Sequence, residues 1–293
     1  MISRLVPAAA FFLGTLAASG QLIVPGFDAA RTGYTQTGEA DMDDGEGSFS
    51  VSRFQLFSAL SRPISPADGW FVVPFFDYRF TDLNIDDAPA DYPIDDEDLH
   101  SLTLSSFIVS MRENSRWIHM GWVRAELATD FEHVNDDDFT FDLAAGSGYR
   151  FNEKFTLGAG ASVMNLNGDV KVYPGINFDW IVNDQFRLGL YGPSFIAAWS
   201  PTEEWLVSFR EDPLGGVWNV AGENGESRAI DYTSFRLGLY LSRRLTGNLW
   251  ITAGGGAVVG NQLDYTTTGG DELVERDADA TFFGSIGLRL KAW

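Results

Sequence analysis

The sequence predicts an all-β fold, an antiparallel up-and-down transmembrane β-barrel of about 14 strands, with about 12 as the alternative. Three observations lead to this prediction. Apolar and polar residues alternate in segments of about ten residues, as expected when one strand face meets lipid and the other meets a lumen. The links between these segments are alternately short and long. After residue 20 no stretch approaches the roughly 18 apolar residues of a membrane helix, so a membrane span would have to consist of strands.

Residues 1–20 have the features of a cleaved signal peptide, which leaves residues 21–293 as the barrel domain. Arg4 precedes a short apolar stretch, and Ala18, Ser19 and Gly20 form a small-residue cleavage site. A buried N-terminal helix is the alternative, and Pro7 argues against it.

An odd number of segments show the strand pattern. One more is expected around Tyr34, because single-chain barrels of this kind have an even number of strands. In chain order the predicted strands cover residues 29–37, 51–60, 70–80, 99–111, 117–131, 139–150, 155–163, 170–180, 186–191, 195–199, 205–210, 235–241, 249–259 and 282–292.

The segments at 139–150 and 155–163 form the clearest predicted hairpin. Phe139, Phe141 and Leu143 alternate with polar or small residues, and Phe155 and Leu157 return on the same face after a short turn. Small residues on the other face leave room in a lumen, or let another side chain fill it. This hairpin therefore has the residue pattern of a membrane barrel.

The next segment, 170–180, is less regular. Val170, Val172 and Ile176 alternate with polar residues, but Pro174 lies between them. Proline cannot donate a ladder hydrogen bond and usually marks an edge strand or a bulge. The last segment alternates without interruption from Phe282 to Ala292.

The predicted turns sort into two kinds. Short turns near residues 113–116, 152–154, 183–185, 201–204 and 246–248 fall on one side of the barrel. Acidic loops at 41–46, 82–98, 130–138 and 271–279 fall on the other. Bacterial outer-membrane barrels have short periplasmic turns and long extracellular loops. A soluble β-sandwich, the alternative fold, has no reason to sort its loops in this way.

On this pattern, residues 28–293 resemble the outer-membrane β-barrel superfamily, and within it the uncharacterised, porin-like families. The resemblance implies the outer membrane of a Gram-negative-type bacterium. It also implies contact with outer-membrane lipid and lipopolysaccharide, and insertion by the barrel assembly machinery. Members usually end in an aromatic residue in phase with the apolar face. Here Trp293 lies one residue out of phase, so either a bulge restores the face or the insertion signal is weak.

Charged residues on the inward face are expected to line the lumen, because charge at membrane depth is tolerated only toward water or a partner. Rings of arginine and lysine lower the barrier for anions. The expected function is therefore a porin-like passive channel for small polar or anionic solutes. The predicted lumen-lining residues are Arg79, Arg124, Glu126, Asp142, Arg150, Lys171, Asp179, Arg187, Arg236 and Arg289.

A closed barrel that acts as an envelope scaffold or a surface-binding protein is the alternative. In that case Arg124 with Glu126, or Arg150 with Asp142, would form structural ion pairs. Bulky inward side chains would fill the lumen. The inward residues that favour this alternative are Phe71, Val73, Phe75, Met120, Trp122, Tyr191 and Tyr240.

Aromatic residues occur where strands meet their turns, and their amphipathic rings suit the lipid headgroup level. Ordinary core aromatics are the alternative interpretation. The predicted interfacial aromatic residues are Trp70, Trp117, Tyr149, Trp180, Trp205 and Trp250.

Catalysis by a lipid-modifying or proteolytic barrel would need a histidine near a serine and an acid in space. His100 and His133 lie beside acidic loops and His119 lies on a strand, but no sequence motif supports catalysis, so no catalytic residue is predicted. No cofactor or metal site is predicted either, because phosphate loops, dinucleotide fingerprints and metal-ligand spacings are absent from the sequence.

The chain has a formal net charge of −21 and no cysteine. The negative charge argues against nucleic acid as a partner, because a phosphate backbone requires a basic surface. Without cysteine there is neither a disulfide nor a thiolate metal site. The acidic loops are expected to be a solvated surface, with cation binding as the alternative.

Overall fold

The computed structural model describes residues 28–43, 47–67, 69–87, 96–112, 114–132, 134–166, 169–222, 227–267 and 272–291. The predicted signal peptide, His133, Trp293 and parts of the acidic loops lie outside these residues. Among the described residues, no helix is long and apolar enough to cross a membrane.

The described residues form mainly strands, and the short 3-10 helix η2 (Asp136–Asp138) lies between β7 and β8. In chain order the strands are β1 (Asp28–Thr37), β2 (Ala40–Asp41), β3 (Ser48–Ala59), β4 (Ile64–Ala67), β5 (Trp70–Asp86), β6 (Glu97–Met111), β7 (Trp117–Thr129), β8 (Phe139–Asn152), β9 (Phe155–Leu166), β10 (Asp169–Ile181), β11 (Phe186–Tyr191), β12 (Ser194–Thr202), β13 (Trp205–Pro213), β14 (Gly216–Ala221), β15 (Ser227–Thr246), β16 (Leu249–Thr267), β17 (Glu272–Ala278) and β18 (Thr281–Lys291).

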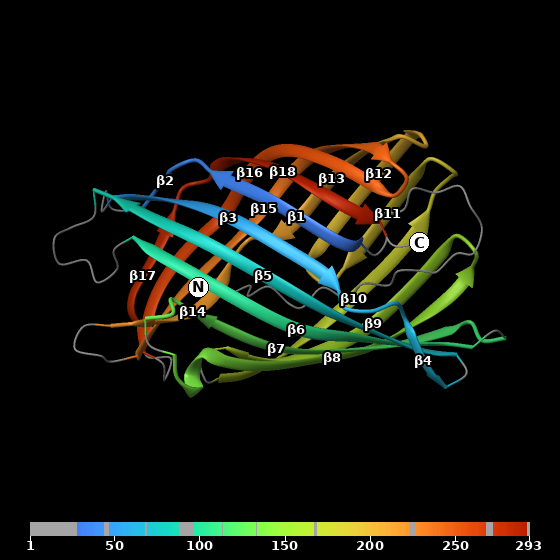
Figure 1. Ribbon diagram of the computed structural model, residues 1–293, viewed down its shortest axis with the longest axis horizontal. Coiled ribbons are helices and arrows are strands. Elements are labelled where there is room, and N and C mark those ends of the chain that lie inside the picture. The colour runs from blue at the N-terminus through green and yellow to red at the C-terminus, as the bar shows by residue number, and fades with distance from the viewer. Residues whose placement is uncertain are drawn as a thin grey trace.

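The wall is a closed antiparallel barrel of 14 strands. Consecutive wall strands pair with each other, and β1 pairs with β18 to close the ring. The predicted strand around Tyr34 is β1, so the expected fold class and strand number are confirmed. Strands β2, β4, β14 and β17 are short additions at the ends of the wall (Figure 1).

The two ends of the barrel differ. Short turns link β6 to β7, β8 to β9, β10 to β11, β12 to β13 and β15 to β16 at the end where β1 begins and β18 ends. We call this the turn end. The short strands β2, β14 and β17 lie at the opposite end, which we call the loop end (Figure 1). This is the sorting of turns and loops that the sequence predicts.

The outward face is apolar around the wall. Leu104 is 58 % exposed, Phe141 69 %, Leu239 63 % and Phe282 72 %, and they come from four different strands. A monomeric soluble protein rarely exposes such a continuous apolar surface, whereas a membrane barrel requires it. The alternation that predicts these strands therefore corresponds to an outer apolar belt.

The inward face is packed at the loop end. One apolar cluster there includes Phe49, Leu83, Trp218, Ile230 and Leu263. Each of these five side chains is at most 2 % exposed. A smaller apolar cluster, with Ile118, Met120 and Tyr191, lies nearer the turn end. Of the bulky inward residues that the sequence singles out, Met120, Trp122, Tyr191 and Tyr240 contribute to these clusters.

Several strands are longer than the sequence predicts, and β15 and β16 extend furthest toward the loop end. β15 begins at Ser227 rather than at 235, and β16 continues to Thr267 rather than ending at 259. Between Thr233 and Phe235, one residue of β15 faces two residues of β16, so β16 has a bulge at Gly260, which has φ of 62°. The bulge shifts the side-chain alternation of β16 by one residue, so its sequence pattern ends there although the ladder continues.

We expect a charge placed on the outer belt to destabilise the barrel according to its depth. Leu239→Arg should lower the free energy of unfolding by about 2–4 kcal/mol, because it lies in the middle of the belt. Leu245→Arg, on the same face of β15 beside the turn, should cost at most about 1 kcal/mol. Urea unfolding from lipid vesicles measures both. Equal, small effects would contradict a membrane-spanning barrel.

Candidate functional site

The first charged group in the lumen is a network on β5, β7 and β8. Arg124 and Asp142 are opposite each other in the β7–β8 ladder, and the Arg124 Nε donates to Asp142 Oδ2 at 2.6 Å. Arg124 Nη1 lies 2.8 Å from Glu126 Oε2, and Arg79 also pairs with Glu126. Arg79 Nε lies 3.4 Å from Asp77 Oδ1. Three carboxylates and two guanidinium groups thus neutralise most of each other's charge on this part of the wall.

A second pair is more isolated and more buried. Arg187 Nε donates to Asp179 Oδ1 at 2.5 Å, and a second guanidinium nitrogen reaches Oδ2. Both side chains are 2 % exposed. A bidentate pair of this kind is fixed in geometry and close to neutral in charge. It therefore acts as a structural support between β10 and β11.

The opposite part of the wall is basic. Arg210 on β13, Arg244 on β15, and Arg289 and Lys291 on β18 lie close enough to act on one another electrostatically. We call these four residues the basic cluster. Two carboxylates lie near it: Asp28 pairs with the Arg289 Nε at 2.9 Å, and Asp212 on β13 acts electrostatically on Arg210.

The basic cluster keeps unused donors. Nη2 of Arg210, Nε of Arg244, Nη1 of Arg289 and Nζ of Lys291 are buried without a hydrogen-bond partner among the described residues. The ring of Trp250 lies under Lys291 Nζ at 4.0 Å and beside the Arg244 guanidinium, at 5.2 Å. Unpaired cations stacked on an aromatic ring form a site that favours an anion.

Two more predicted charges face the lumen away from these groups. Arg236 lies over the Phe283 ring and donates to Thr35 Oγ1 at 3.3 Å. Arg150 lies opposite Thr156 near the turn end. In the predicted structural alternative Arg150 paired with Asp142. In the structure Arg124 holds Asp142 instead, because these two residues are direct cross-strand neighbours.

Strand β14 crosses the loop end of the barrel. It pairs with β15 along one edge and meets β7 through Asn219 and Thr129, on the far side of the ring. The Asp130 carboxylate accepts from the Ala221 amide at 2.7 Å. The Trp218 indole donates to Ser101 Oγ at 2.9 Å, and Arg53 donates to the Leu214 carbonyl. The loop end is therefore closed by a strand that is fixed on both sides.

Sequence reasoning did not find β14. Leu214, Trp218 and Val220 alternate in even positions, which is the signal that could have found it. The segment is only six residues long, begins with Gly216 and follows Pro213 and Gly215, so its start has the composition of a loop.

The aromatic residues at the turn end form a chain of ring contacts on the outside. Trp117 meets Tyr149, Tyr149 meets Phe151, and Phe151 meets Phe155, with centroid distances of 5.1, 5.0 and 5.6 Å. Trp180 pairs with Phe155 across the β9–β10 ladder. Trp70 is 39 % exposed at the start of β5. The guanidinium carbon of Arg243 lies over the ring of the outward Trp205, 5.2 Å from the ring centroid.

The prediction for Trp250 is wrong. This side chain is 1 % exposed and packs inside the barrel with Ala198 and Leu206. Leu249 and Ile251 take the outward positions, so the even position between them faces inward. Proximity to a turn alone does not fix the face of an aromatic residue.

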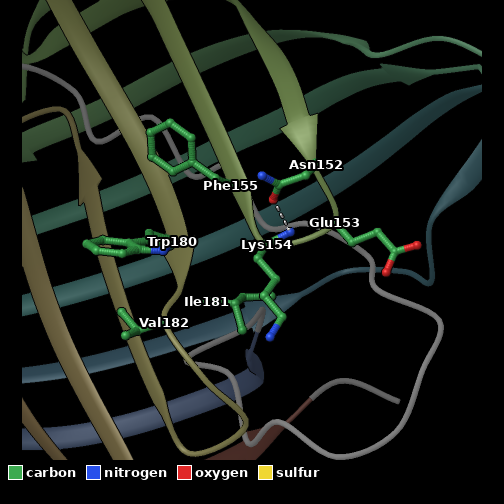
Figure 2. Close-up of a pocket in the computed structure, with 7 residues that line it drawn as sticks. All are labelled: Asn152, Glu153, Lys154, Phe155, Trp180, Ile181 and Val182. Carbon is green, nitrogen blue, oxygen red and sulfur yellow. Dashed lines mark hydrogen bonds between the residues drawn. The ribbon is translucent and has the colours of Figure 1, made fainter.

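A shallow depression of about 440 Å³ lies at the turn between β8 and β9 (Figure 2). Asn152 Oδ1 accepts from the Lys154 amide at 2.8 Å and closes the turn, while Phe155 of β9 and Trp180 of β10 line the depression. Aromatic rings beside a lysine suit the lipid headgroup level, which is the place that the sequence predicts for Trp180.

The described histidines do not form a catalytic group. His100 Nδ1 is 2.9 Å from the Tyr78 hydroxyl and packs against Phe80 and Phe131. His119 Nδ1 is 2.8 Å from Ser147 Oγ, but no described carboxylate pairs with the imidazole. No group of three metal-ligating side chains occurs in the part of the chain that the structure describes.

A family model described as "Domain of unknown function (DUF6268)" matches residues 73–291. No curated protein matches the chain in sequence. Among solved structures, the COG4313 outer membrane channel from Pseudomonas putida F1 is similar at 11 % identity and a TM-score of 0.46, covering 91 % of this chain and 96 % of that one.

Two porins are also similar in structure. KdgM, in complex with disordered oligogalacturonate, has 7 % identity and a TM-score of 0.37, covering 90 % of this chain and 99 % of that one. NanC has 8 % identity and a TM-score of 0.33, covering 90 % and 98 %.

Removing one member of the charged network should destabilise the barrel. Asp142→Ala removes one of the two carboxylates that pair with Arg124, leaves buried guanidinium donors without their acceptor, and should cost about 3 kcal/mol of unfolding free energy. The double variant Asp142→Ala with Arg124→Met should recover most of that loss, because the unsatisfied donors are then gone. Unfolding of both variants from vesicles measures this. A double variant as unstable as the single one would contradict the pairing.

Proposed function

The chain belongs to the DUF6268 family, and we propose that it is a porin-like outer-membrane transport barrel for small anionic solutes. The observation that carries the proposal is the basic cluster, whose unused donors face the interior of a closed barrel. A low-dielectric wall concentrates the field of such a cluster into the lumen. Anions are thereby favoured over cations along this part of the path.

The distribution of charge across the lumen supports this proposal. The network on β5, β7 and β8 holds its carboxylates in ion pairs, while the basic cluster has Asp28 as its pairing carboxylate. A row of cross-strand neighbours joins the basic cluster to the charged network. It runs from Arg289 through Arg31 and Phe57 to Asp77. A solute at this row would therefore meet excess positive charge on one side and a nearly neutral surface on the other.

Strand β14 makes the proposed transport conditional. Its crossing and the apolar cluster around Trp218 obstruct the loop end, so a straight passage needs β14 to move. A barrel that is closed at rest protects the envelope from leakage, and it conducts only when this segment opens. We therefore infer a low resting conductance.

A closed scaffold is the second candidate, and the packed loop-end cluster favours it. A scaffold has no use for buried unpaired cations, which cost stability unless something binds to them. The two candidates differ in whether ions pass at all. Outer-membrane location, contact with lipopolysaccharide and insertion by the barrel assembly machinery belong to both proposals.

The basic cluster should set ion selectivity. In planar bilayers with a potassium chloride gradient, the reversal potential should show chloride preference. The variant with Arg210→Gln, Arg244→Gln and Arg289→Gln should lose most of it. Arg243→Gln is the matched control, because this neighbouring arginine lies outside over Trp205. Cation selectivity of the wild-type protein, or an equal effect of the control, would contradict the proposal.

Weakening the anchor of β14 should raise the conductance. Trp218→Ala removes the largest buried side chain of the crossing segment and its bond to Ser101. The open probability in single-channel recordings should rise, by about tenfold if roughly 1.4 kcal/mol of the closing free energy is lost. Trp70→Ala, on the outer surface, should leave it unchanged. Silence of both variants in folded barrels would favour the scaffold.

A further inference from the structure

The strands between β10 and β15 are short, so the barrel wall does not extend as far toward the loop end there as elsewhere. β11 has six residues, whereas β10 has 13 and β15 has 20. Six residues tilted by about 45° rise only about 14 Å, which is little more than half of the roughly 25 Å apolar belt of such barrels. The top of β11 therefore lies within the membrane and not above it.

Above β11 the neighbouring strand has an open edge. β10 pairs with β11 only from Asn177 to Ile181, and no described strand pairs with that edge over residues 169–176. Pro174, which has no amide hydrogen to donate, lies in this stretch, as expected for an edge. Outward Val170, Val172 and Ile176 are 69, 64 and 65 % exposed. An apolar outer face of this kind belongs in hydrocarbon, so the gap opens toward lipid.

On the other side of the gap the wall turns inward. β13 pairs with the turn-end half of β15, but β14 takes over from residue 227 to 232 and then crosses to β7. β14 thereby closes a smaller tube from β15 through β1 to β7, and this tube holds the apolar loop-end cluster. The loop-end halves of β8, β9 and β10 lie outside that tube. We call the space that their inward faces border, behind β14, the chamber.

The chamber has space. A Cβ added at Gly175, on the inward face of β10, would meet no atom within 4 Å. The neighbouring inward positions are small, with Gly160 opposite Gly175 in the ladder and Gly146 opposite Gly160. Beside these glycines lies the apolar cluster of Tyr191, Met120 and Ile118, with Met120 opposite Gly146 in the ladder. An apolar molecule at Gly175 would therefore meet glycines and apolar side chains, with Tyr173 as the bulky inward side chain next to it on β10.

The rim of the gap carries polar groups. Lys171 is half-buried on the inward face of β10 and makes no ion pair or hydrogen bond with a described residue. Tyr173 lies two residues further, and Asp231 on β15 is the charged group that acts on it across the gap. One cation without a partner beside an apolar chamber matches a ligand with an anionic head and an apolar body.

We propose that the gap between β10 and β15 is a lateral opening, through which an amphipathic anion with an apolar chain exchanges between the outer leaflet and the chamber behind β14. The inference rests on the proposed transport function and names its substrate class. Such a ligand needs no opening of the loop end. Its head would contact Lys171 first, and the basic cluster attracts it further into the barrel.

Spin-labelled lipids test this opening, because the chain has no cysteine and a single introduced thiol is unambiguous. Gly175→Cys carries a bimane fluorophore in the chamber, and the probe is doxyl-labelled stearate in phosphatidylcholine nanodiscs. Gly284→Cys, on the lipid-facing side of β18, is the positive control. Thr103→Cys, buried behind the complete wall of β5, β6 and β7, is the negative control. Heat-modified migration on gels confirms that each variant is folded.

Bimane at Gly175 should be quenched nearly as strongly as at Gly284, and several times more than at Thr103. Lys171→Gln should weaken quenching by the stearate at Gly175 about fivefold, because one cation is lost. Quenching at Gly175 no greater than at Thr103 would overturn the opening. The preference for an anion would be overturned if doxyl-phosphatidylcholine quenched bimane at Gly175 as strongly as doxyl-stearate did, and if Lys171→Gln left that quenching unchanged. Chloride conductance of the unlabelled Gly175→Cys protein, measured separately, tests the transport function alone.

Discussion

The constraint on which this structure depends is the satisfaction of backbone hydrogen bonds in hydrocarbon. Without water, each amide and carbonyl in the belt needs a partner, and only a closed ladder provides one for every strand. Pairing of β1 with β18 closes the ring. Closure fixes the direction of every side chain: odd and even positions face either lipid or lumen. The charged network, the Arg187–Asp179 pair and the basic cluster all face inward because the outer face excludes them.

Among the described residues, the ladder is incomplete beside β10, and the same constraint explains why this place is notable. β11, β12 and β13 are too short to match β10 and β15, and β14 leaves the wall and crosses the barrel. The loop end is thus divided into a packed tube and a chamber beside it. The loop end is obstructed, the wall has a lateral gap, and the interior has cations with unused donors. All three features fit a solute that is an anion and does not have to enter along the barrel axis.

Much of this could be predicted from the sequence, and the exceptions have a physical reason. Alternation with a period of two residues predicts the wall strands, their number and the inward charges, because one residue in two must be apolar outside. It cannot predict which inward charges meet, since Arg124 and Asp142 become neighbours only through register. Alternation also fails to predict strands where it is broken, at the β16 bulge that contains Gly260, and where a strand leaves lipid, as β14 does. Trp250 shows that composition near a turn does not fix a face.

The central claim is that the interior carries an accessible positive potential, and a single cysteine inside the barrel measures it most directly. Ser285 is inward and half-buried, beside Tyr240, over which the Arg210 guanidinium lies at 4.9 Å. The measurement compares the rates at which negatively and positively charged methanethiosulfonates modify Ser285→Cys, each normalised to a free thiol in solution. The account predicts that the negative reagent reacts about tenfold faster or more. Equal rates, or a faster positive reagent, would contradict it.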